Sequence, residues 1–189
     1  MKYLYDKKIK SNTDFNIWMA FPGNKTFALS ALGFMFLCKS FDLMECVNFE
    51  PIYLDTKKTS IMSKDVNLMG FSFAFDMDFL SILTILDQHN IPKKSSERNE
   101  NHPFVFGGGP VLTTNPEPYY EIFDFVIIGD GEDIINDIVK ICRENREKSR
   151  KDVLKLLSEL DGIYVPTLNQ KQVKKLNIIK YKMFVLYEM

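Results

Sequence analysis

Short, continuous apolar runs alternate along this chain with longer segments in which apolar residues recur every three or four positions. Continuous runs that end at glycine, proline or aspartate are typical of strands buried on both faces of a sheet. Recurrence every three or four positions predicts amphipathic helices. The pattern predicts strands at residues 17–21, 46–54, 67–75, 104–106 and 123–129, with Pro51 favouring an edge position for the second.

Helical segments are predicted between and after these strands. They cover residues 27–38, 132–148 and 151–160, with a further helix behind Asp76 and Asp78, which are suited to cap it, and a short one capped by Asn115. The run at 27–38 is too short to span a bilayer, so we expect a buried helix there. Strands that alternate with helices predict an α/β fold with a parallel sheet covered on both faces.

We predict one domain at residues 1–160 and a small strand-rich extension at residues 161–189. The stretches GIYVP and VKKLNIIKYKMFVLY in this extension have the composition of extended strands. Five lysines lie between positions 171 and 182. A half-exposed strand pair explains these lysines better than a contact with RNA, which is the minority interpretation.

Composition narrows the class of protein. With 189 residues, 46% of them hydrophobic, the chain is long enough to bury a substantial core. Its formal net charge of −1 gives no reason to expect nucleic acid or an anionic membrane as a partner. Cys38, Cys46 and Cys142 fit neither a disulfide framework nor a zinc site, and the first residues lack the apolar core of a signal peptide. We expect a soluble cytoplasmic protein with reduced thiols.

Three loops rich in glycine or proline follow predicted strands. The carboxyl ends of parallel strands meet at one edge of the sheet, where ligands bind beside the point at which the strand order reverses. Adjacent glycines leave the backbone bare for a close approach. The hydroxyl of Ser72 can bind a ligand amide or a neighbouring loop equally well. The predicted cofactor-binding site comprises Pro22, Gly23, Asn24, Ser72, Gly107, Gly108, Gly109, Pro110, Gly129, Asp130, Gly131 and Glu132.

The chemistry of these loops excludes some ligands. The stretch GDGEDI begins like the dinucleotide fingerprint G-x-G-x-x-G but lacks its third glycine. Asp130, Glu132 and Asp133 crowd the start of the following helix, where they would repel a phosphate. A tight turn with acidic capping and a site for a neutral ligand both fit this stretch. Neither His89 nor His102 has metal-ligating neighbours at a usual spacing, so we predict no metal site and no catalytic residue.

Several motifs together resemble the N-terminal, cobalamin-binding-like domain of a family of radical SAM proteins. They are PGNKTFALSALGF, GFSFAFDMDFLSILTILD, FGGGPVLTTNPEP, FDFVIIGDGED and GIYVP, in this order, within residues 17–166. The resemblance implies a flavodoxin-like, doubly wound parallel sheet of five strands in the order 2-1-3-4-5. In full-length relatives it implies a following radical SAM barrel that binds a [4Fe–4S] cluster and S-adenosylmethionine through C-x-x-x-C-x-x-C.

This chain lacks that cysteine motif. We therefore expect a module that is not catalytic alone and that serves a radical SAM barrel in cis or in trans. It is either a truncated product or a stand-alone accessory module, and the strand-rich tail favours truncation.

The resemblance leaves the ligand open. Cobalamin domains with a histidine lower ligand carry D-x-H-x-x-G after the first strand, whereas this chain has no histidine before His89. Cobalamin (vitamin B12), if it is bound, must therefore be held without a histidine. Alternatively, the loops dock against the barrel and the glycines serve close packing. The remaining interpretation is a free-standing flavodoxin-like domain that binds a nucleotide or flavin, which the acidic residues at 130–133 disfavour.

Overall fold

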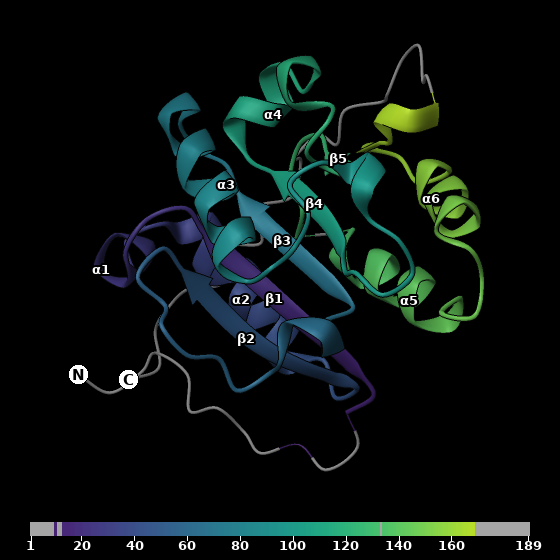
Figure 1. Ribbon diagram of the computed structural model, residues 1–189, viewed down its shortest axis with the longest axis horizontal. Coiled ribbons are helices and arrows are strands. Elements are labelled where there is room, and N and C mark those ends of the chain that lie inside the picture. The colour runs from purple at the N-terminus through teal and green to yellow at the C-terminus, as the bar shows by residue number, and fades with distance from the viewer. Residues whose placement is uncertain (1–9, 11–12, 133, 169–189) are drawn as a thin grey trace, which may run out of the picture.

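A six-stranded sheet forms the centre of the protein in the computed structural model, which describes residues 10, 13–132 and 134–168 (Figure 1). The strands lie in the order β2-β1-β3-β4-β5-β6. The first five strands pair in parallel, and β6 pairs antiparallel with β5. The strands are β1 (Phe15–Phe21), β2 (Val47–Tyr53), β3 (Leu68–Ser72), β4 (Phe104–Gly108), β5 (Phe125–Ile127) and β6 (Ile163–Tyr164).

This topology confirms the predicted flavodoxin-like α/β fold and its strand order 2-1-3-4-5, with β2 and its Pro51 at a sheet edge. The sheet has one strand more than the five predicted. The added strand, β6, lies in the stretch GIYVP, which was expected to be a strand of the extension. A strand of two residues has no periodicity that would assign it to a sheet, so sequence alone could not place it.

Helices cover both faces of the sheet, as a doubly wound fold requires. Along β1, the side chains of Ile17 and Met19 pack in the core with α2, α5 and α6. Those of Trp18 and Ala20 pack in the opposite core with α3 and α4. The helices are α1 (Lys25–Ala28), α2 (Leu32–Leu43), α3 (Phe79–Gln88), α4 (Pro110–Thr114), α5 (Ile135–Glu144) and α6 (Arg150–Ser158), with short 3-10 helices at Ser63–Asp65, Asp76–Asp78, Ser95–Glu97, Glu117–Tyr119 and Pro166–Leu168.

The prediction of one buried helix at residues 27–38 is wrong. A turn separates α1 from α2, and in it the Ser30 hydroxyl donates to the carbonyl oxygen of Phe27 at 2.7 Å. The side chains of Phe27 and Leu32 are 67% and 81% exposed. The run is apolar on nearly every side, so packing one face of each helix on the sheet leaves the other apolar face in solvent. Among the described residues, no helix has both the length and the apolar character needed to cross a membrane.

The predicted caps are confirmed in part. The side-chain oxygen of Asn115 accepts from the backbone N–H of Glu117 at 3.2 Å, just ahead of the 3-10 helix Glu117–Tyr119, although Pro116 holds the cap position itself. Neither predicted aspartate caps α3 with its side chain. Asp78 accepts instead from the N–H of Phe75 at 3.0 Å, and Asp76 accepts from the hydroxyl of Tyr119 at 2.8 Å.

Candidate functional site

The three predicted loops lie at one edge of the sheet, which we call the carboxyl edge. They follow β1, β4 and β5, which run in parallel, so the prediction of a shared edge is confirmed. Ser72 pairs with Gly108 at the end of β3. The hydroxyl of Thr113 in α4 accepts from the N–H of Gly129 at 3.0 Å, which ties the loop after β4 to the loop after β5. A ligand role for these residues stays a prediction.

The loop after β1 uses its polar groups within the fold. Pro22 is buried, and the carbonyl oxygen of Gly23 accepts from the N–H of Leu54 beyond the end of β2 at 3.0 Å. The side-chain oxygen of Asn24 accepts from the N–H of Phe27 at 3.1 Å and so caps α1. This loop therefore joins β1 to its neighbour and starts a helix, which accounts for its sequence without a ligand.

Internal packing explains two of the three adjacent glycines. A Cβ at Gly107 would lie 2.4 Å from the Leu112 side chain, so this glycine makes room for α4. Gly109 has a φ of 117°, and a Cβ there would lie 2.6 Å from the carbonyl oxygen of Phe73. At Gly108 a Cβ would meet only Ile127, at an ordinary 3.7 Å. Of the three, Gly108 alone has no packing reason to be a glycine. Pro110, next in the chain, is exposed at the start of α4.

The loop after β5 packs against α2. Gly129 has a φ of 106°, a conformation that favours glycine, and a Cβ at Gly131 would contact the Leu37 side chain at 3.5 Å. Asp130 and Glu132 are partly buried in front of α5. The described residues fit the interpretation of a tight turn with acidic residues ahead of a helix. Asp133, the third predicted acid of this stretch, lies outside the described residues.

The Asn-Pro-Glu-Pro turn after α4 is a structural tie between distant segments. Its Glu117 carboxylate accepts from the Tyr164 hydroxyl in β6 at 2.6 Å. Burial, together with this hydrogen bond to a carboxylate, raises the pKa of Tyr164 to about 12. The Tyr119 hydroxyl donates to Asp76 behind β3, and its ring packs on Phe73. The turn therefore joins the segments that follow β3 and β4 to β6.

Seven large apolar side chains are exposed at residues 27–36 and 75–80, shortly after β1 and β3, which are neighbouring strands. Met77 is 83% exposed and Phe75 is 72% exposed. Single exposed apolar residues are normal on a protein surface, but their concentration behind two adjacent strands marks a surface for interaction. We call this set the apolar edge: Phe27, Leu29, Leu32, Phe36, Phe75, Met77 and Leu80.

Both histidines lie away from the carboxyl edge. His89 follows α3 and His102 precedes β4, which places both toward the amino ends of the strands. The described part of the chain therefore has no histidine at the carboxyl edge, and cobalamin with a histidine lower ligand does not fit there. Within the same part, no three His, Cys, Asp or Glu residues form a group that could hold a metal ion. Burial raises the pKa of the Cys142 thiol to about 12.

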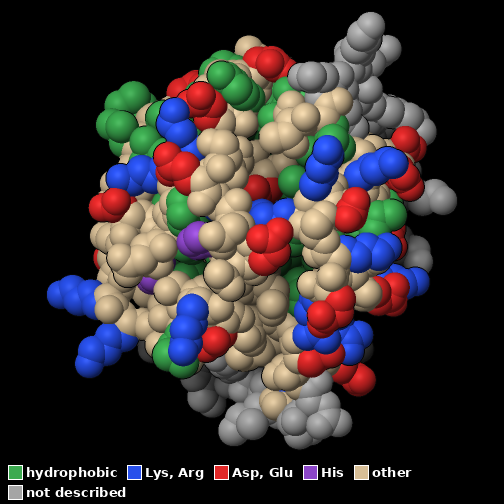
Figure 2. Space-filling model, turned by 45° about the vertical axis from the view of Figure 1, so that its right-hand side comes forward, with side chains coloured by type: hydrophobic (Ala, Val, Ile, Leu, Met, Phe, Trp, Pro, Cys, Tyr) green, Lys and Arg blue, Asp and Glu red, His purple; other side chains and the backbone are tan. Residues whose placement is uncertain are grey.

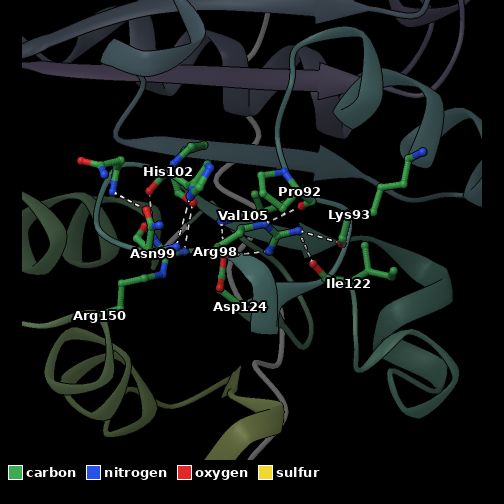
Figure 3. Close-up of polar contacts among 11 residues, drawn as sticks. Pro92, Lys93, Arg98, Asn99, His102, Val105, Ile122, Asp124 and Arg150 are labelled. Carbon is green, nitrogen blue, oxygen red and sulfur yellow. Dashed lines mark hydrogen bonds and ion pairs between the residues drawn. The ribbon is translucent and has the colours of Figure 1, made fainter.

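A buried ionic network lies at the opposite edge, and sequence reasoning missed it (Figure 3). Arg98 and Arg150 converge on one carboxylate oxygen of Asp124, at 3.0 and 2.9 Å, and the same oxygen accepts from the N–H of Val105 at 2.7 Å. The guanidinium of Arg150 also stacks on the ring of Phe104. Arg98 further donates to the carbonyl oxygens of Pro92, Lys93 and Ile122, and Arg150 to those of Asn99, His102 and Pro103.

This network holds the polar loop between α3 and β4 against the sheet. Burial lowers the pKa of Arg98, and Asp124 acts against that effect. The sequence carried a signal for it, because Asp124 stands alone among apolar residues in the stretch IFDFVII. A carboxylate in a buried strand requires a charged partner. The sequence gives no indication that this partner lies in the loop at residues 92–103.

The comparisons with known proteins give one match, to a family model. A family model described as "Radical SAM proteins, N-terminal" matches residues 35–166, over two thirds of the chain. No curated protein and no solved structure matches the chain. The matched segment runs from within α2 to Pro166, just beyond β6, and includes the loops after β3, β4 and β5. The chain therefore belongs to the family formed by the N-terminal regions of radical SAM proteins.

Proposed function

We propose that this chain is a docking module whose carboxyl edge binds the catalytic domain of a radical SAM protein. The observation that carries the proposal is the apolar edge, seven exposed large side chains behind two adjacent strands. Family membership supports a radical SAM domain as the occupant, because the family consists of N-terminal regions of radical SAM proteins. The partner covers the apolar edge and takes its side chains out of water.

The loops at the carboxyl edge support docking better than they support an enclosed cofactor. Gly107 and Gly109 are required by packing inside the chain, so their bare backbone does not need a ligand as its explanation. Gly23 and Asn24 also make their hydrogen bonds within the fold. The apolar edge lies here among exposed polar residues such as Asn24 and Asp76, and apolar surface is the main source of association energy between proteins.

Cobalamin held without a histidine ligand stays a prediction. Gly108 is the glycine of the triplet that a ligand would explain, because its Cβ position is not filled by the fold. Gel filtration of the chain with hydroxocobalamin, followed by visible absorption of the protein peak, tests it. Co-elution that a Gly108→Leu substitution abolishes would add cobalamin to the docking function. A flavin or nucleotide at this edge gains no support, because Asp130 and Glu132 precede α5 where a phosphate would lie.

Removing part of the apolar edge is expected to weaken binding of the catalytic domain about 100-fold, in the range found for interface hot spots. The variant is Met77→Gln with Leu80→Gln, which removes apolar surface without adding charge near the start of α3. Both side chains are mostly exposed, so the fold should not change. The dissociation constant is measured by calorimetry against a radical SAM catalytic domain from the source organism, supplied as a separate protein.

The matched control is Met62→Gln with Leu43→Gln. These side chains are 59% and 63% exposed but lie toward the amino edge, before β3 and at the end of α2. The control should bind as the wild type does. An equal loss in both variants, or no loss in either, would remove the apolar edge from the proposed interface.

A further inference from the structure

A second candidate site lies at the amino edge of the sheet, opposite the docking surface. A cavity of about 480 Å³ is bounded by the segments that precede β1, β3 and β4, the end of α5 and the start of α6. This volume lies in the range of sites for small organic ligands and exceeds what an inorganic ion needs. Ligands of doubly wound folds bind at the carboxyl edge, so the fold itself does not account for a cavity here.

Positive charge is concentrated at this cavity. Its lining includes Lys64, Arg146, Lys148 and Arg150, with Glu100 as the acidic member. Two further arginines support the lining arginines through shared carboxylates. Asp14 bridges Arg143 and Arg146, and Asp124 bridges Arg98 and Arg150. These are six cations against three carboxylates, an excess of three positive charges in a chain whose net charge is −1. The surface that carries α5 and α6 shows basic and acidic side chains interspersed (Figure 2).

Arg150 and the lysines that line the cavity differ in how firmly their side chains are held. Arg150 is fixed by four hydrogen bonds and by stacking on Phe104, so it forms a rigid wall. Lys64 and Lys148 are exposed, and neither forms an ion pair or side-chain hydrogen bond with the described residues. A fixed guanidinium beside two mobile ammonium groups is suited to an anion that the lysines close upon.

Neutral groups add hydrogen-bond donors to the cavity. The Nδ1 of His102 accepts from the N–H of Asn99 at 3.1 Å, so the neutral ring carries its proton on Nε2. The side-chain oxygen of Asn67 accepts from the N–H of Asn16 at 2.8 Å, which leaves its NH₂ group as the donor. His102 and Asn67 therefore add donors to those of the two lysines, as a ligand rich in acceptor oxygens requires, whereas the Asn145 NH₂ group donates inside the fold.

Apolar side chains complete the lining. They are Phe15, Val66, Phe104, Cys142 and Val153, of which Phe104 is partly exposed and the other four are buried. An inorganic anion would leave the exposed part of Phe104 without a contact, whereas a ligand with an apolar ring and an anionic group would satisfy both parts of the cavity.

We propose that this cavity binds a small organic phosphate ester, with the phosphate toward Lys64 and Lys148 and the apolar part on the Phe104 side. The site is independent of the docking function, because it lies at the other edge of the sheet and stays accessible when the carboxyl edge is covered.

Binding of phenyl phosphate tests this proposal on the full chain. The probe joins a ring to a phosphate, and its two halves, phenol and inorganic phosphate, serve as comparisons. Two-dimensional NMR titration should give saturable amide shifts around residues 64–67, 99–104 and 145–153. Phenyl phosphate should bind at least tenfold more tightly than inorganic phosphate, and its affinity should fall as salt concentration rises.

Lys64→Ala with Lys148→Ala should weaken phenyl phosphate binding at least tenfold. Lys57→Ala with Lys58→Ala is the matched control, because these lysines are equally exposed but follow β2 at the other edge. The control should bind as the wild type does. Absence of saturable shifts, shifts centred outside the cavity, or an equal loss in the control pair would overturn the proposal. None of these results bears on docking at the carboxyl edge.

Discussion

Replacing Asp124 with asparagine is expected to lower the free energy of unfolding by about 3–5 kcal/mol, the range for breaking a buried ion pair from one side. Asparagine has nearly the shape of aspartate, so the loss does not arise from a cavity. It arises because Arg98, whose side chain is fully buried, and Arg150, 12% exposed, lose the carboxylate between them. Urea unfolding followed by circular dichroism measures the change.

The control for this variant is Asp14→Asn. Asp14 also sits between two arginines, Arg143 and Arg146, but its side chain is 40% exposed. Hydrogen bonding to Arg143 lowers the pKa of Asp14, yet solvent screens such a pair. The expected loss is therefore far smaller than the loss for Asp124→Asn. Similar losses for the two variants would mean that burial does not set the strength of the Asp124 network.

Replacing Gly109 with alanine is expected to destabilise the fold by about 2–4 kcal/mol, because backbone strain adds to a steric clash. Its φ of 117° with ψ of 179° is a conformation that only glycine adopts readily. The added Cβ would also meet the backbone oxygen of Phe73, which cannot turn aside as a side chain would. The shift in the urea midpoint measures this loss.

The neighbouring glycines provide an internal series. Gly107→Ala should cost about 1–3 kcal/mol, because it overpacks the contact with Leu112. Gly108→Ala should change stability by no more than about 0.5 kcal/mol, since its Cβ has room. Equal losses at the three positions would contradict the assignment of separate roles to these glycines.

The strands of this fold were predictable from sequence because they are buried on both faces. Continuous apolar runs such as the one at β1 have few other structural meanings when glycine or proline ends them. The strand order came from the family resemblance and is confirmed. What sequence reasoning missed are features set by tertiary contacts. The break between α1 and α2, and the antiparallel addition of β6, depend on packing that no local pattern encodes.

The position of the candidate site could be predicted from the sequence, but the roles of its glycines and the exposure of its apolar side chains could not. Loops after parallel strands had to meet at one edge, and they do. Sequence reasoning assigned the glycines to a ligand, because it could not see Leu112 and Phe73 packed against Gly107 and Gly109. It also took Phe27 and Leu32 as buried, because an apolar residue is buried far more often than it is exposed. The exposure of these side chains is the feature that distinguishes a docking surface from a core helix.

Hydrogen–deuterium exchange tests whether the apolar edge is the docking surface. Exchange is followed by mass spectrometry for this chain alone and with a radical SAM catalytic domain from the source organism. We expect a complex in which protection appears in peptides covering residues 23–36 and 73–83, while peptides covering 60–67 and 99–104 exchange as in the free chain. A complex protected at the amino edge instead, or the absence of any complex, would contradict it.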